Sequence, residues 1–173
     1  SVDNGEILYG LAAIKNVGAN VVDSIIAERE KNGPYKSFMD FLSRQGDATL
    51  NSRLVECLIK TGCFDELGID RAILLANLDE AFRYDKAQKS QSAFGQLSLF
   101  GGEEESMLGE FEMKNADPFP FLEKLKMEKE LLGFYISGHP LDSYEKEIRE
   151  CVKVNVSDPD TIVLGQDTQI IGQ

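Results

Sequence analysis

The chain has 173 residues, 42% of them hydrophobic, and a formal net charge of −12. So acidic a chain cannot hold nucleic acid through its overall charge, and any such contact has to be local. Residues 1–89 contain 14 acidic and 11 basic side chains, whereas residues 90–173 contain 16 acidic and 7 basic ones. We therefore expect a nucleic-acid contact, if there is one, in the first half.

Other features of the sequence bear on the compartment. No apolar run reaches the 18 residues of a membrane-spanning helix, and the N-terminus lacks the pattern of a signal peptide. The chain starts at Ser1 without a methionine, so we interpret it as an excised fragment. Its three cysteines, Cys57, Cys63 and Cys151, show no paired spacing, which is typical of reduced thiols in a cytoplasmic protein.

Apolar residues recur at helical spacing through the first half, between turns that contain glycine. The pattern predicts two copies of helix, turn and helix, with a short helix between the copies. The predicted helices cover residues 8–14, 21–30, 38–42, 52–59 and 71–88. Ser37, Asn51 and Asp70 each precede a predicted helix and are good N-cap residues.

The turn between the first two helices, Lys15–Gly18, suggests a phosphate contact. The first amides of the following helix lack intrahelical acceptors, and helix N-termini of this kind bind phosphate groups without reading base sequence. Lys15 and Lys60 each add a positive charge beside a turn. The residues alone are equally compatible with two helical hairpins that pack only for stability.

Between residues 92 and 117 the helical period is lost and glycine, serine and glutamate predominate, which predicts a flexible acidic linker. The linker contains a short apolar stretch formed by Gln96, Leu97, Ser98, Leu99 and Phe100. The apolar side chains either fold back onto the helices or enter a pocket of a partner protein. In the second case Leu99 and Phe100 are the anchors, and Gln96 fixes the register by hydrogen bonds.

A helical hairpin is predicted over residues 118–153. The inward face of its first helix carries five apolar residues, Phe121, Leu122, Leu125, Leu132 and Ile136. Lys124 and Glu128, four residues apart, are expected to form an exposed ion pair. His139 stands before Pro140, where the second helix begins, and we expect it to act locally as a cap. From residue 154 the pattern changes to two short strands.

Four segments are informative in combination, and they read YGLAAIKNVGANVVDSIIAERE (9–30), FMDFLSR (38–44), LIKTGCFDELGIDRAILLANLDEA (58–81) and MEKELLGFYISGHPLDSYEKEI (127–148). In this order they resemble the alpha-subunit family of bacterial DNA polymerase III, the replicative C-family DNA polymerases, in the region after the palm and fingers. The resemblance implies a mainly α fold, with a tandem helix-hairpin-helix domain over residues 1–91 and the start of a truncated OB-fold over residues 154–173. Asn16 departs from the family, in which this turn usually has glycine, but asparagine tolerates left-handed backbone angles.

The resemblance also implies two binding sites. The residues expected to contact the backbone of double-stranded DNA are Lys15, Asn16, Val17, Gly18, Ala19, Asn20, Lys60, Thr61 and Gly62. The stretch 96–100 looks like the pentapeptide with which this family binds the sliding clamp, the beta subunit. The implied function is to support processive DNA replication, together with the other polymerase domains and holoenzyme subunits, without a membrane contact.

Catalysis, metal binding and cofactor binding are not expected in this chain. The resemblance places the catalytic carboxylates of the palm upstream of it. Cys57 and Cys63 have no further metal ligands nearby, and the sequence has neither a Walker-type loop nor a Rossmann fingerprint. Two competing hypotheses are an acidic helical protein-interaction adaptor that does not bind DNA, and a small enzyme that uses His139 with a cysteine, for which the sequence offers no support.

Overall fold

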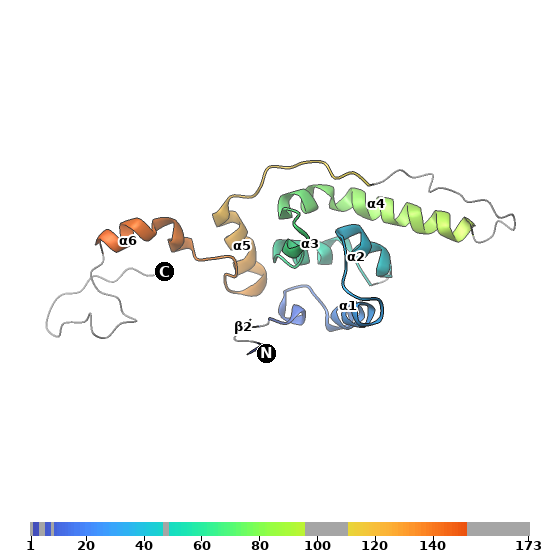
Figure 1. The fold of residues 1–173 in the computed structure, drawn as a ribbon, viewed down its shortest axis with the longest axis horizontal. Coiled ribbons are helices and arrows are strands. Elements are labelled where there is room, and N and C mark those ends of the chain that lie inside the picture. Colours follow the sequence, from blue (N-terminus) through green and yellow to red (C-terminus); the bar gives the residue numbers. More distant parts are fainter. Residues whose placement is uncertain (1, 4–5, 8, 47–48, 96–110, 152–173) are drawn as a thin grey trace. The chain divides into compact units, whose positions relative to one another are not determined.

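A computed structural model, shown in Figure 1, describes residues 2–3, 6–7, 9–46, 49–95 and 111–151 of the chain. The chain divides into two compact units, Ser1–Tyr135 and Ile136–Gln173, and each is described by itself. The described residues are mainly helical, which confirms the mainly α part of the predicted fold. Within this part of the chain, no helix combines the length and the apolar character needed to cross a membrane.

The first unit begins with two short strands, β1 (Val2–Asp3) and β2 (Glu6–Ile7), which pair antiparallel. A single 3-10 turn, η1 (Leu11–Ala13), replaces the short helix predicted over residues 8–14. It ends because Ile14 is extended, with a ψ of 131°. Helix α1 (Ala19–Asn32) then runs two residues further than predicted at each end.

Helices α2 (Phe38–Arg44) and α3 (Ser52–Lys60) begin at the predicted N-caps. The Ser37 hydroxyl accepts a hydrogen bond from Asp40 N at 3.0 Å, and Asn51 Oδ1 accepts one from Leu54 N at 2.9 Å. Each side chain satisfies an amide that has no acceptor inside its helix, which fixes where the helix starts. The predicted apolar face of α3 is buried, and it consists of Leu54, Val55, Leu58 and Ile59.

A 3-10 turn, η2 (Asp65–Leu67), leads into the longest helix, α4 (Arg71–Gly95), which is capped by Asp70 as predicted. The prediction that this helix fades near Gln88 is wrong, because it continues for seven more residues. The extension rests on contacts distant in sequence. The Lys89 ammonium pairs with Asp85 at 2.7 Å and donates to two carbonyls at the C-terminal end of α2 and just beyond it.

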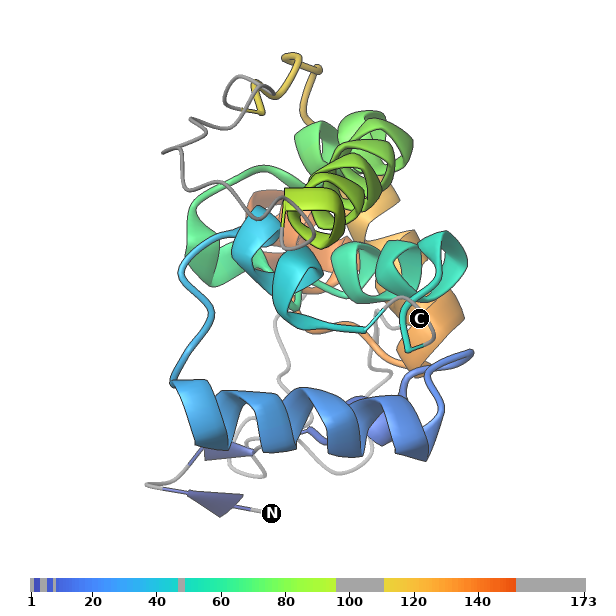
Figure 2. The same ribbon diagram turned by 90° about the vertical axis from the view of Figure 1, so that its right-hand side faces the viewer.

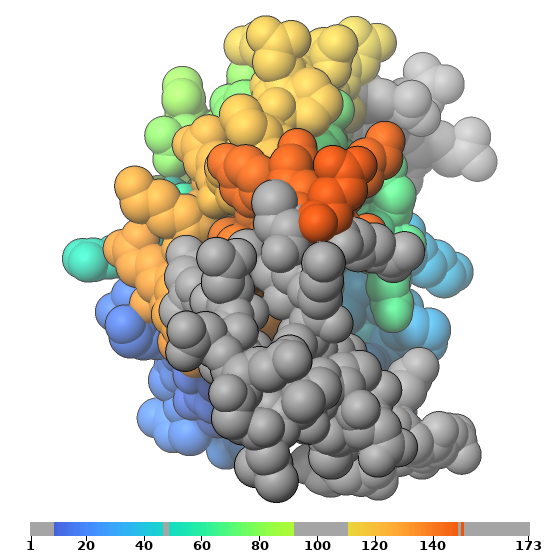
Figure 3. Space-filling view, turned by 90° about the vertical axis from the view of Figure 1, so that its left-hand side faces the viewer, coloured from blue at the N-terminus to red at the C-terminus, as the bar shows by residue number. Residues whose placement is uncertain are grey.

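Residues 111–120, which we call the return segment, form an extended strand of chain along α4 (Figure 1). The buried Asn77 side chain donates to Lys114 O and accepts from Lys114 N, both at 2.8 Å, as a neighbouring β-strand would. In the space-filling view the return segment, in yellow, lies against green atoms of α4 (Figure 3). The prediction of a flexible linker over residues 92–117 is therefore wrong for 92–95 and 111–117.

Helix α5 (Phe121–Leu132) follows the return segment. It ends where Gly133 adopts a left-handed conformation, with a φ of +89°, so the predicted continuation to Ile136 is wrong. Leu125 and Leu132 are buried as expected. Phe121 is 40% exposed, so the predicted inward face begins one turn later than expected.

The core of the first unit lies between layers of helices. Both α2 and α3 pack on α4, and α3 also packs on α5. Figure 2 shows α1, in blue, as a layer of its own on the side of α2 and α3 away from α4. The Tyr35 hydroxyl joins these layers, because it donates to Ile25 O of α1 at 2.9 Å while its ring packs edge-on against Phe41 of α2.

The second unit is described as far as residue 151 and contains η3 (Pro140–Tyr144) and α6 (Glu145–Cys151). The strands and OB-fold start predicted over residues 154–173 lie outside the described residues. The helical hairpin predicted over 118–153 has its two helices in different units and stays a prediction.

Candidate nucleic-acid interface

The first hairpin turn, residues 14–20, has a buried side and an exposed side. Ile14 and Val17 are 4% and 6% exposed and belong to the core, whereas Lys15 and Asn16 are exposed. Asn16 has a φ of +67°, which is the left-handed conformation that a glycine would otherwise supply. The apolar residues thus anchor the turn, and asparagine preserves its shape.

The backbone amides of this turn divide into used and unused donors. Lys15 N donates to Leu131 O of α5 at 3.0 Å, and Val17 N donates to Ile14 O at 3.1 Å. Residues 18–20 are exposed, their amides have no hydrogen-bond acceptor among the described residues, and no side chain caps α1. These donors lie at the positive end of a 14-residue helix whose first turn contains no acidic residue. The arrangement suits an anion such as a phosphate group.

Lys15 adds an accessible positive charge to this turn. No carboxylate among the described residues forms an ion pair with its ammonium group. An unpaired exposed lysine keeps its full charge available to a ligand at modest desolvation cost. The first turn therefore combines amide donors without an acceptor among the described residues and one cation, all in exposed residues.

The second hairpin turn, which follows α3, is partly buried and bonded to the rest of the protein. The Thr61 hydroxyl is buried and donates to two carbonyls of α3. Lys60 is half-buried and its ammonium pairs with Glu56 one turn earlier. Gly62 has a φ of +81°, and a Cβ atom at this position would lie 2.3 Å from Nη2 of Arg71. The glycine in this turn thus makes room for a guanidinium group of the same chain.

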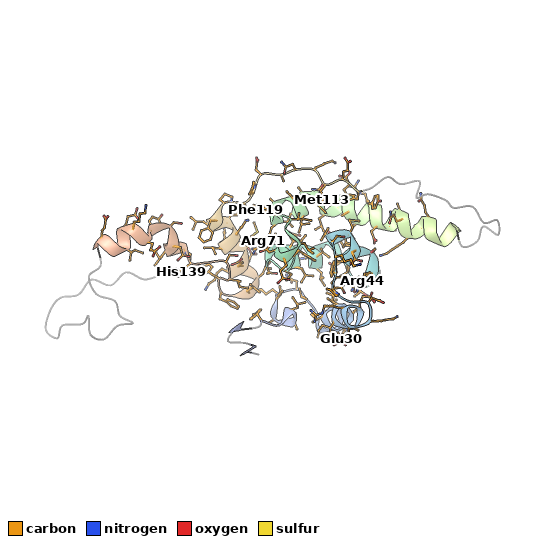
Figure 4. The ribbon with its side chains drawn as sticks, in the orientation of Figure 1. Glu30, Arg44, Arg71, Met113, Phe119 and His139 are labelled. Atoms are coloured by element: carbon orange, nitrogen blue, oxygen red, sulfur yellow. The ribbon has the colours of Figure 1, made fainter. Side chains whose placement is uncertain are left out.

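Arg71, labelled in Figure 4, is the centre of an ion network that the sequence did not predict, with a buried partner, Glu128, and a half-exposed one, Asp65. Its Nη1 donates to Glu128 Oε1 at 2.9 Å and to Lys60 O at 3.1 Å, and its Nη2 donates to Asp65 Oδ2 at 2.6 Å. The side chains of Arg71 and Glu128 are 4% and 0% exposed. Burial opposes the charge of Arg71, but the hydrogen bonds to Asp65 and Glu128 outweigh it and raise the pKa of Arg71.

The predicted exposed ion pair between Lys124 and Glu128 is wrong. Lys124 Nζ pairs instead with Asp70 Oδ2 at 3.0 Å, and Glu128 turns inward. The sequence contained a signal for this outcome. Glu128 falls three residues after Leu125 and four before Leu132, on the apolar face of its helix, and a carboxylate buried there requires a cationic partner.

His139 and Cys57, the other side chains considered for catalysis or metal binding, have local structural surroundings. His139 is the predicted cap, since its Nδ1 accepts from Leu141 N at 3.2 Å and its own amide donates to Asp142 Oδ2 at 2.6 Å. The Cys57 thiol is buried, as expected. In the described ranges, no cluster of three or more histidine, cysteine or acidic side chains could hold a metal ion.

The predicted clamp-binding residues, Gln96 to Phe100, lie outside the described residues. The chain on either side of residues 96–110 is described. Helix α4 ends at Gly95, and the return segment begins at Phe111, whose ring lies 5.3 Å from that of Tyr84. Tyr84 precedes Gly95 by 11 residues, about 16 Å along the helix. Both flanks of residues 96–110 are thus attached to α4.

Comparison with known proteins first shows a similarity in the N-terminal part of the chain. The family model described as "Helix-hairpin-helix motif" matches residues 1–74, which cover the first hairpin turn, the second turn and the start of α4. Within these residues the first turn joins η1 to α1, and the second turn joins α3 to η2 and α4.

The particular relatives are DNA polymerase III alpha subunits. The chain is 45% identical over 157 residues to that of Borreliella burgdorferi, covering 90% of this chain and 14% of the relative. The corresponding values are 42% over 150 residues (87% and 13%) for Treponema pallidum and 38% over 152 residues (87% and 13%) for Escherichia coli. Over most of its length the chain is similar to these DNA polymerase III alpha subunits, and it spans about one-eighth of the length of these curated relatives.

Proposed function

We propose that this segment contacts the backbone of duplex DNA through the first hairpin turn, as a non-catalytic part of a bacterial replicative DNA polymerase in the cytoplasm. The observation that carries the proposal lies at the N-terminus of α1, where the exposed residues 18–20 have amides without an acceptor among the described residues. Lys15, beside them, has no carboxylate partner in the same described ranges. Backbone amides and one lysine bind phosphate oxygens without reading bases, which suits a polymerase that copies any sequence.

The second hairpin turn has a smaller part in this proposal. Thr61 and Gly62 are engaged inside the protein, so Lys60 is the residue of that turn best able to reach a phosphate group, after releasing Glu56. The first turn thus supplies most of the DNA contact.

The proposal includes a second site, in which Gln96, Leu97, Ser98, Leu99 and Phe100 bind the sliding clamp. Its support is the sequence of this stretch and the homology to DNA polymerase III alpha subunits. Leu99 and Phe100 are the apolar anchors, and Gln96 fixes the register. A short peptide of this kind adds its affinity to that of the DNA contact, because both ligands hold the same chain. Other polymerase domains and holoenzyme subunits complete the assembly.

DNA binding is tested by fluorescence anisotropy of a labelled duplex against the 173-residue chain over a series of salt concentrations. Lys15→Glu weakens binding equally for duplexes of different sequence. Lys15→Gln lowers the slope of log affinity against log salt by about 1, since one phosphate contact is lost.

Lys31→Gln is the matched control, because Lys31 lies at the opposite end of α1, roughly 20 Å from the turn. An equal loss in Lys31→Gln and Lys15→Gln contradicts a DNA site at the first turn. Absence of DNA binding at every salt concentration favours the acidic adaptor instead.

Clamp binding is tested by titrating a purified bacterial sliding clamp with the double variant Leu99→Ala, Phe100→Ala. The variant loses clamp binding while its affinity for DNA stays unchanged. The control variant, Met107→Ala with Leu108→Ala, removes two apolar side chains from the same stretch of chain and retains clamp binding. Unchanged clamp binding by the first variant contradicts this part of the proposal.

A further inference from the structure

We infer that α5 acts as a strut that positions the first hairpin turn for DNA, by joining it to the second turn through Leu131 and Glu128. The inference rests on the proposed contact between the first turn and DNA. It extends the DNA-contacting unit beyond residues 1–91 to include α5, which follows residues 96–110 in the sequence.

One end of the strut is a backbone hydrogen bond. The last four carbonyls of a helix have no acceptor role inside it, and one of them, Leu131 O, accepts from Lys15 N at 3.0 Å. Lys15 directly precedes Asn16, whose side-chain Nδ2 lies 3.8 Å from Cys57 Sγ of α3. The exposed turn is thus held at two points. The backbone of Lys15 is bonded to α5, and the side chain of Asn16 contacts α3. Figure 3 shows α5, in light orange, beside the blue N-terminal region.

The other end of the strut is the buried ion pair. Glu128 Oε1 accepts from Arg71 Nη1 at 2.9 Å, and the same nitrogen donates to Lys60 O, the last residue of α3 before the second turn. The Arg71 guanidinium also fills the space that a side chain at Gly62 would occupy. Glu128 therefore holds the second turn through Arg71.

The two attachments share one rigid element. Glu128 and Leu131 are three residues apart on α5, about 4.5 Å along its axis, so they lie on the same side of the helix. A helix cannot change this spacing without losing hydrogen bonds. Because both turns are fixed to the same helix, the position of the first turn is set relative to α3 and α4.

The strut makes a distinctive prediction for DNA binding. Loosening it leaves every DNA-facing charge in place, so the number of phosphate contacts and the salt slope stay unchanged. The affinity falls because the turn has to be ordered on binding, and ordering the backbone of one residue costs about tenfold in affinity. By contrast, replacing a residue that contacts phosphate directly lowers both the affinity for DNA and the salt slope.

The test is the double variant Arg71→Met, Glu128→Leu in the 173-residue chain. Replacing both members of a buried pair with apolar residues of similar size keeps the fold, whereas removing one leaves an unpaired buried charge. The control is Lys124→Gln, which breaks the ion pair between α5 and Asp70 but touches neither turn. Each variant is measured at a temperature where its circular dichroism shows it fully folded.

The expected result for the double variant is an affinity for duplex DNA reduced about tenfold at an unchanged salt slope. The Lys15 amide also loses protection in hydrogen exchange, while the amides in the middle of α3 keep theirs. Lys124→Gln stays within about twofold of the unmodified chain, as expected of a lost surface ion pair.

The strut hypothesis is wrong if the folded double variant keeps both its affinity for DNA and the hydrogen-exchange protection of the Lys15 amide. A salt slope that falls together with the affinity also overturns it, because Arg71 then contacts DNA itself. If the unmodified chain shows no binding to duplex DNA, the proposed function fails, and the positioning role fails with it. Binding by the unmodified chain without weakening in the double variant removes the strut alone.

Discussion

Replacing Asn77 with alanine tests how the return segment is held. Asn77 is 1% exposed, and its amide makes two hydrogen bonds to the backbone of Lys114 and a third to Ile73 O. The two bonds to Lys114 are each worth about 0.5–1.5 kcal/mol, so we expect Asn77→Ala to lower the free energy of unfolding by about 2 kcal/mol. For a chain of this length that lowers Tm by roughly 4–8 °C.

The assay combines thermal unfolding with hydrogen exchange of the Lys114 amide, whose acceptor in the native chain is Asn77 Oδ1. Glu80→Ala is the matched control, since it removes the exposed ion pair between Glu80 and Lys114 and leaves the backbone bonds intact. The control leaves the free energy of unfolding nearly unchanged, because both side chains of this ion pair are exposed to solvent. An unchanged exchange rate for the Lys114 amide in Asn77→Ala would refute the reasoning.

Three further predictions concern single side chains. Asp70→Asn keeps the cap of α4 but loses the pair with Lys124. The hydrogen bond from the Ala72 amide and the pair with Lys124 together hold the pKa of Asp70 below its ordinary value of 3.8, so its contribution to stability is present above pH 3.8 and is lost as the pH falls below it. The acid-side fall in Tm between pH 4 and pH 2 is therefore shallower in the variant, and an identical profile would contradict this assignment. Asn16→Ala destabilises by about 1–2 kcal/mol because of its left-handed backbone, whereas Asn16→Gly does so by less, as urea unfolding would show. Ser37→Ala removes the cap of α2 and lowers the free energy of unfolding by about 1 kcal/mol, a loss that Ser37→Asp should largely avoid.

The sequence predicted the local features of the first unit well. Ser37, Asn51 and Asp70 cap the helices that follow them, because a cap acts on amides only two or three residues away. Asn16 takes the left-handed conformation for an equally local reason, since few residues other than glycine and asparagine tolerate it. The exposed residues of the first turn could thus be found without coordinates.

Contacts between distant residues were beyond the sequence. The periodicity of α5 marks its apolar face but does not say that Glu128 meets Arg71, 57 residues away. The pairing of Asn77 with Lys114 joins residues 37 apart, and no pattern in residues 111–117 shows that an asparagine serves as their hydrogen-bonding neighbour. The extension of α4 to Gly95 escaped prediction for a similar reason, because Lys89 is held by the end of α2.

Gly95 is the last residue of α4, and Lys114 is hydrogen-bonded to Asn77 of the same helix. These two points limit how far a partner bound to residues 96–100 can lie from α4. Gln96 directly follows the last residue of α4, and five residues extend at most about 17 Å. A clamp bound there would therefore lie close to the C-terminal end of α4, and its range of orientations relative to this helix would be small. Insertions after Phe100 would lengthen only the connection from Phe100 to the return segment. They would change neither the distance from α4 to residues 96–100 nor the position of α5.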